Sequence, residues 1–393
     1  MRHRCMECAI ALTMIASGVT MSMADPPTIL MPGVAPSEAS VFVKLMTLAT
    51  TDEEAAVQMS RDILRRDPKN AVVLFFQVGQ FSRMGKLDEA SRSLALLREQ
   101  KPGWILGWQA EVDLLDVMGE YKKEADALET FMRKEFQDPL EAAVAEGMRA
   151  SAPARLAELR GKMEDAEAVW KTLIDDKKAG DAERSARMVE MGRFYLRHSL
   201  DAKAEGVLVR ATETGEGAMS DDAKADALLP LVTALWAQGR VDQAVAKSKD
   251  LLRICGRLPL DSDVCLQALL TSYVLFKKAD DKASAGQAEA LLKKAAGMDA
   301  MAKRITGLAP LVRDKWKRQD VRDVAERTRR VLKDAPRLDW ARWTALYLAI
   351  ENPAEHEGLL KALPDDSVQR RIYRQLAKTD SQSVSTSPAS GSE

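Results

Sequence analysis

Few residues of this chain have the type and spacing that catalysis or metal binding requires. Three histidines are present, His3, His198 and His356, and AEHEGLL around His356 lacks the second histidine of an H-E-x-x-H metal site. His198, in LRHSLD, is expected at a helix end, near the negative end of the helix dipole. The sequence contains neither G-x-S-x-G nor G-x-x-x-x-G-K-[ST]. We therefore expect a protein that is not an enzyme and that uses no cofactor and no metal.

Paired carboxylates are the other candidates for acid–base chemistry. Asp175–Asp176, Asp221–Asp222 and Asp365–Asp366 all stand beside turn signals. Aspartate at such places commonly caps the first turn of a helix, because its carboxylate accepts hydrogen bonds from free backbone N–H groups. The pattern favours helix caps over a pair of catalytic carboxylates.

Two cysteines in the body of the chain could form a covalent bond. Cys255 and Cys265 flank GRLPLDSDV, which is expected to join two helices. A disulfide between them would close a short loop and contribute about 3 kcal/mol in the chain-entropy model. We predict this disulfide, and two separate buried thiols are the alternative.

The N-terminus has the pattern of an export signal. Arg2 and Arg4 precede the apolar stretch AIALTMIASGVTM (9–21), and SMA precedes Asp25. We expect cleavage after Ala24 and a periplasmic or secreted protein, with a retained anchor as the alternative. The C-x-x-C spacing of Cys5 and Cys8 would be lost with this segment 1–24. A proline-rich linker is expected at 25–36, and a polar, disordered tail at 379–393.

Composition and a repeated pattern indicate an all-α fold. The chain has 393 residues, of which 46% are hydrophobic, 30% charged and 5% aromatic, and its net charge of −1 gives no general attraction to nucleic acid. RMGKLDEASRSLALLREQKP (83–102) and VMGEYKKEADALETFMRKEF (117–136) share one pattern, and Gly85 and Gly119 are 34 residues apart. The same step separates Pro68 from Pro102. A constant step of this length is typical of stacked helix pairs.

The segment 71–139 resembles the tetratricopeptide repeat family, whose unit is a helix–turn–helix of 34 residues. With Pro102 at repeat position 32, bulky residues fall where the family has them, at Leu74 and Trp108. The small or apolar residues of the second helix are Ala90, Leu94 and Leu97, followed one repeat later by Glu124, Leu128 and Phe131. Glu124 departs from the family pattern, which has a small residue at that position.

The resemblance implies a right-handed superhelical solenoid of about eight helix pairs. Regular repeats are expected at 37–139, degenerate repeats at 140–336 and a C-terminal helical cap at 337–378, made of helices at about 338–350 and 354–378. Pro153 is expected to start or kink its helix. No other segment is apolar enough to cross a membrane.

In the family, the first helices of the pairs line a concave groove, which would bind an extended peptide or a partner helix. The residues placed there by repeat position, and predicted to contact a protein partner, are Phe75, Arg83, Gln109, Asp113, Asp116, Arg193, Arg197, Thr233 and Trp236. The carboxylate clamp of chaperone-binding repeats is missing, because after residue 24 the chain has only two asparagines, Asn70 and Asn352.

Two functions follow. The first is a non-catalytic, exported scaffold for protein–protein interactions in envelope assembly or in polysaccharide or protein export. The alternative is a periplasmic protein that binds glycan or peptidoglycan through Trp340, Trp343 and Tyr347 and through the basic segment 311–337. Aromatic residues at helical spacing are more often core, and an interleaved charged helix is usually a solvated face.

Overall fold

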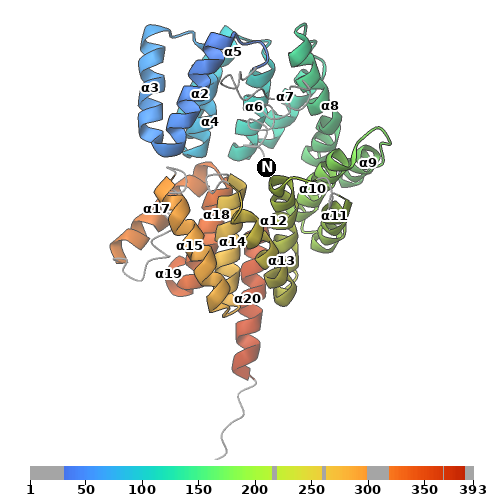
Figure 1. Ribbon diagram of the computed structural model, residues 1–393, viewed down its shortest axis with the longest axis vertical. Helices are drawn as coiled ribbons and strands as arrows, with labels where there is room; N and C mark the ends of the chain where they lie inside the picture. Colours follow the sequence, from blue (N-terminus) through green and yellow to red (C-terminus); the bar gives the residue numbers. More distant parts are fainter. Residues whose placement is uncertain (1–30, 215–218, 259–262, 299–317, 366, 386–393) are drawn as a thin grey trace, which may run out of the picture. The chain divides into compact units, whose positions relative to one another are not determined.

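The computed structural model describes residues 31–214, 219–258, 263–298, 318–365 and 367–385 (Figure 1). These residues form eighteen helices and no strand, which confirms the predicted all-α fold. The chain divides into two compact units, Met1–Leu173 with Asp334–Leu338 (unit 1) and Ile174–Lys333 with Asp339–Glu393 (unit 2). The expected boundary at residues 139 and 140 lies at the start of a helix inside unit 1.

Unit 1 is built from consecutive antiparallel helices. They are α2 (Pro36–Thr51), α3 (Glu53–Arg66), α4 (Ala71–Arg83), α5 (Leu87–Gln100), α6 (Ile105–Met118), α7 (Tyr121–Met132), α8 (Pro139–Leu159) and α9 (Met163–Ile174), whose last residue falls in unit 2. Pro153 lies inside α8, which continues through it.

The repeated glycines and prolines stand at the turns between these helices. Gly85 and Gly119 have φ of 67° and 72°, a left-handed conformation that glycine adopts without a side-chain clash. Helices α3 and α5 end two residues before Pro68 and Pro102. Proline cannot continue a helix and restricts the residue before it, so these prolines mark the ends of the repeat units.

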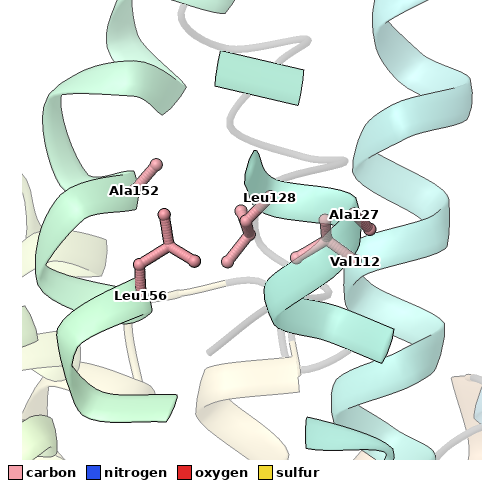
Figure 2. Packing of buried hydrophobic residues seen from close by; sticks show 5 residues of the cluster. All are labelled: Val112, Ala127, Leu128, Ala152 and Leu156. Carbon is pink, nitrogen blue, oxygen red and sulfur yellow. The ribbon is translucent and has the colours of Figure 1, made fainter. Parts of the chain in front are cut away.

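Buried apolar residues join neighbouring helices of unit 1. Figure 2 shows one such cluster, to which α6 contributes Val112, α7 contributes Ala127 and Leu128, and α8 contributes Ala152 and Leu156. Leu128 is one of the predicted repeat-core residues. Because each helix pair presents an apolar stripe that only a neighbouring pair can cover, stacking of pairs forms one continuous core.

Unit 2 repeats the same arrangement. Its helices are α10 (Asp181–Arg197), α11 (Asp201–Thr214), α12 (Asp221–Ala237), α13 (Val241–Cys255), α14 (Asp263–Lys278), α15 (Lys282–Met298), α17 (Arg318–Asp334), α18 (Asp339–Glu351), α19 (Pro353–Lys361) and α20 (Val368–Ser385). His198 follows the last residue of α10, the helix-end position that the sequence predicts.

The C-terminal region differs in detail from the expected cap. The single helix expected at 354–378 is two helices, α19 and α20, separated by a connection that contains Pro364. Proline removes a backbone donor, and the hydroxyl of Ser367 accepts a hydrogen bond from the Arg370 backbone N–H at 3.4 Å, so a new helix starts there. Residues 379–385, expected to be disordered, continue α20.

The start of the described chain is attached to unit 1. The Trp104 indole N–H donates to the Pro32 carbonyl at 2.6 Å, and the Lys101 ammonium donates to the Gly33 carbonyl at 3.0 Å. Residues 31–35, expected to belong to an extended linker, are therefore held by side chains of the turn between α5 and α6. The predicted signal segment 1–24 lies outside the described residues. No helix in the described part of the chain is long and apolar enough to span a membrane.

Candidate functional site

Each unit has two layers of helices, and one layer is the candidate binding surface. In unit 1, α2, α4 and α6 pack successively against one another, and in unit 2, α10, α12 and α14 do the same. In a curved stack, the layer whose helices lie closest together is on the inside. We call these layers the inner faces of unit 1 and unit 2, and they contain all nine predicted partner-binding residues.

The first predicted residue, Phe75 of α4, is buried on the inner face of unit 1. Its ring stacks on Phe42 of α2 with centroids 5.8 Å apart, and it meets the edge of Trp104 at 5.4 Å. Gln109 of α6 is also buried, whereas Arg83 and Asp113 are partly exposed. On this face the two charged residues are more accessible than the aromatic and amide residues predicted beside them.

Asp116 belongs to a buried network of charged side chains. The Arg155 guanidinium of α8 contacts the carboxylates of Asp116 at 2.6 Å, Glu124 at 2.8 Å and Glu158 at 2.8 Å. Arg337 also contacts Asp116, at 2.7 Å. The side chains of Arg155 and Glu124 are 9% and 0% exposed, so the Coulomb attraction acts in a poorly solvated environment.

This network explains the departure at Glu124. The family pattern has a small residue there because two helices approach closely, and Glu124 is fully buried at that contact. Two nitrogens of Arg155, Nε and Nη2, each donate to one Glu124 oxygen at 2.8 Å, which satisfies the carboxylate without water. Sequence reasoning missed Arg155, although a charge at a core position is a signal that a buried partner exists.

On the inner face of unit 2, Arg193 is paired within the fold. Its guanidinium contacts Glu190 at 2.6 Å, one turn earlier in α10, and Asp226 in the neighbouring helix α12. Burial alone would lower the pKa of Arg193, but the two carboxylates more than offset it and the pKa is raised. Arg193 thus joins two inner helices, and its side chain is only 16% exposed.

The remaining predicted residues of unit 2 differ in accessibility. Arg197 is partly exposed at the end of α10. Thr233 is buried and donates to the Leu229 carbonyl at 2.9 Å, and Trp236 is fully buried. For all nine residues, a role in partner binding stays a prediction.

The last helix of the chain packs on the inner face of unit 2, which sequence reasoning did not foresee. Helix α20 contacts α12 and α18. Its Arg371 forms a two-point ion pair with Asp201, the first residue of α11, at 3.0 Å and 2.5 Å. It also donates to the Ser199 hydroxyl in the turn before α11 and to the Leu196 carbonyl near the end of α10. The sequence signal that could have suggested this is the amphipathic pattern QRRIYRQL (369–376), which gives the helix an apolar side.

The aromatic residues considered for glycan binding are part of the core where they are described. Trp343 is 4% exposed and Tyr347 is 1% exposed, with the Tyr347 ring 6.1 Å from that of Tyr273. The side chain of Trp340 and residues 311–317 lie outside what the structure describes. In α17, Arg322 pairs with Glu355 and Arg330 with Glu326. Trp343 and Tyr347 are thus core residues, and glycan binding at this region stays a prediction.

Cys255 and Cys265 lie next to each other as buried thiols. The Cys265 sulfur is 3.9 Å from the Cys255 carbonyl, and its hydrogen bond to the Cys255 thiol, together with burial, raises the pKa of Cys255. The predicted disulfide therefore requires only that neighbouring thiols lose two electrons and two protons to an external disulfide or quinone oxidant. Burial and a raised pKa slow this reaction, because the thiolate is the reacting form.

We expect the chain purified from an oxidising compartment to contain the Cys255–Cys265 disulfide, and its reduction to lower the free energy of unfolding by about 3 kcal/mol. Mass spectrometry of alkylated peptides, combined with thermal melts with and without reductant, measures both effects. The Cys265→Ser variant, which cannot form the bond, should melt at the same temperature under both conditions. Two alkylated thiols in the unreduced protein would contradict the prediction.

No cluster of three or more metal-binding side chains occurs among the residues that the structure describes. His356 is 3% exposed, and its pKa is lowered chiefly by burial. The neighbouring Glu355 carboxylate acts in the opposite direction on this pKa, but the effect of burial is larger. Several charged residues instead form ion pairs that connect helices, such as Arg155 with Glu124 and Arg193 with Asp226.

No family model and no curated protein matches the chain. Among solved structures, a putative kinesin light chain of Podosopora anserina with nearly identical TPR-like repeats is 16% identical, covering 49% of this chain and 93% of that one with a TM-score of 0.35. A Rap protein complexed with Competence and Sporulation Factor is 14% identical, with a TM-score of 0.47, and the match covers 87% of this chain and 100% of that one. The P58(IPK) TPR domain is 15% identical, with a TM-score of 0.24, and the match covers 90% of this chain and 99% of that one. All three TM-scores are below 0.5, so the all-helical architecture rests on the eighteen described helices themselves.

Proposed function

We propose that this chain is a non-catalytic scaffold that binds helical segments of partner proteins on the inner faces of its helix stacks. The observation that supports the proposal is the position of α20, which packs against the inner-layer helix α12 while its Arg371 pairs with Asp201 at the start of α11. Repeat stacks present extended inner surfaces whose side chains can vary without disturbing the core. Helix binding to such a surface is a common mode of peptide recognition.

The proposal includes export. The basic N-terminal residues, the apolar stretch 9–21 and the small residues before Asp25 support cleavage of a signal segment. An exported scaffold would serve envelope assembly or export of polysaccharide or protein. Cell fractionation and N-terminal sequencing test this part: a mature chain that begins at Asp25 in the periplasm supports it, and an uncleaved chain in the cytoplasm contradicts it.

Site-specific crosslinking in the host tests partner binding. A photo-crosslinking residue at Arg197, partly exposed on the inner face of unit 2, should capture one protein that mass spectrometry identifies repeatedly. The matched control is the same residue at Leu96, which is 47% exposed on the second layer of unit 1 and should not capture that protein. When the captured partner is purified as the bait, this chain should be recovered with it. Equal capture at both positions would reject the inner face as the binding surface.

A further inference from the structure

The attachment of α20 has the geometry of a ligand bound to a surface. Both terminal oxygens of Asp201 accept from Arg371, at 3.0 Å and 2.5 Å, while the Leu196 carbonyl accepts at 2.9 Å and the Ser199 hydroxyl lies at 3.1 Å. A planar guanidinium suits this set, because its donors are fixed in direction and two of them match a carboxylate. The side chains of Arg371 and Asp201 are each 13% exposed. We call these four residues the arginine anchor.

Apolar contacts accompany the anchor along one side of α20. Ile372 is fully buried and Leu376 is 6% exposed, four residues further along the helix. Gln369, one turn before Ile372, is buried as well, whereas Arg374 on another side is exposed. A helix with buried residues at such spacing is an amphipathic helix seated on a partner surface.

The connection between α19 and α20 makes this contact intramolecular. Helix α19 ends at Lys361 and α20 begins at Val368, so a short connection keeps α20 beside the inner face. A short tether gives the attached segment an effective concentration of about 1 mM, against which a free ligand must compete. Beyond Leu376 the sequence of α20 is mostly polar, AKTDSQSVS (377–385), and Figure 1 shows this part of the helix running past α13 and α14. The buried apolar residues described for α20, Ile372 and Leu376, lie in the first half of the helix.

We propose that the inner face of unit 2 is a binding site for an amphipathic helix that carries an arginine, and that α20 is its resident, displaceable occupant. The partner helix has an arginine at the position of Arg371, followed by apolar residues one and five positions later, as Ile372 and Leu376 are in α20. Asp201 and the Leu196 carbonyl select arginine over lysine, because lysine cannot contact all acceptors in one plane. This inference rests on the proposed scaffold function and names the chemistry of its partner.

A peptide of residues 367–385, labelled with a fluorophore, tests the site on the full-length protein by fluorescence anisotropy. The wild-type chain should bind it weakly, because its own α20 competes. The Arg371→Glu chain should bind it at least about ten times more tightly, because charge reversal releases the tethered helix and leaves the anchor acceptors free. The matched control is Arg374→Glu, an exposed residue of the same helix, and it should bind as the wild type does.

A peptide that itself carries Arg371→Glu should bind none of the three chains. Equal affinity of the wild-type and Arg371→Glu chains for the normal peptide would overturn the proposal, as would binding of the charge-reversed peptide. The assay uses no cellular partner, so its failure is distinguishable from a failure to capture one by crosslinking at Arg197.

Hydrogen exchange on the same variants separates displacement from unfolding. In the Arg371→Glu chain, backbone amides of residues 368–376 should lose protection while those of α10, α12 and α14 keep it. Loss of protection throughout unit 2 would show that α20 is a required part of the core, and it would overturn the proposal.

Discussion

Replacing Arg155 by methionine is expected to lower the free energy of unfolding by about 3–5 kcal/mol, since removing one partner of a buried ion pair leaves the other charges uncompensated. Arg155 is the common partner of Asp116, Glu124 and Glu158, and Glu124 is fully buried. Methionine retains much of the volume and apolar stem, so the loss reports on charge rather than on a cavity. Denaturant titration of the two proteins measures the difference.

The control for this prediction is Arg160→Met. Arg160 forms an ion pair with Glu129, but its side chain is 50% exposed, so its replacement should cost less than about 1 kcal/mol. Adding Glu124→Leu to Arg155→Met should recover part of the loss, because the most deeply buried unpaired carboxylate is then gone. If Arg155→Met and Arg160→Met are equally stable, the network does not support the fold.

The sequence predicted local structure well wherever the residues that determine a turn or a helix end lie within one repeat. Gly85 and Gly119 take the left-handed conformation of their turns, and helices end before Pro68 and Pro102. The repeat-core residue Leu128 is buried among α6, α7 and α8. These features depend on neighbours within about one repeat length, and a periodic pattern reports such neighbours directly.

Contacts between distant parts of the sequence could not be predicted in the same way. Arg371 and Asp201 are 170 residues apart, and no spacing in the sequence links them. One helix was expected at about 354–378, whereas the chain breaks around Pro364 into α19 and α20. Thus, the cap was expected, but its attachment to the inner face was not.

The position of a candidate residue in the repeat predicted correctly which helix layer the residue belongs to. It did not predict how exposed the side chain is. Phe75 and Trp236 were placed on inner helices, and there both are buried, Phe75 against the rings of Phe42 and Trp104. Arg193, on the same layer, is paired with Asp226 of the next helix. A family position fixes direction relative to one helix pair, whereas burial also depends on which large or charged residues the adjacent pair supplies.

Leucines of α5 provide a graded test of how stability is distributed in the stack. Leu97 is fully buried and its side chain packs beside Gly107 of α6, where an added Cβ would lie 3.9 Å away. Leu94 is half-buried and Leu96 is 47% exposed. The three positions are on one helix and have the same side chain, so they differ mainly in the contacts that alanine would remove.

Leu97→Ala is expected to reduce the free energy of unfolding by about 2–5 kcal/mol, because it removes apolar contacts and leaves a cavity between α5 and α6. Leu94→Ala should cost about 1–2 kcal/mol, and Leu96→Ala should stay within about 0.5 kcal/mol of wild type. In a stack held together by nearest neighbours, the loss should appear first in the adjoining helices, so amides of α4 to α6 should exchange faster in Leu97→Ala while those of α12 to α14 stay protected. Hydrogen exchange with thermal melts measures both, and uniform loss of protection over the two units would show a single cooperative fold instead of locally stabilised repeats.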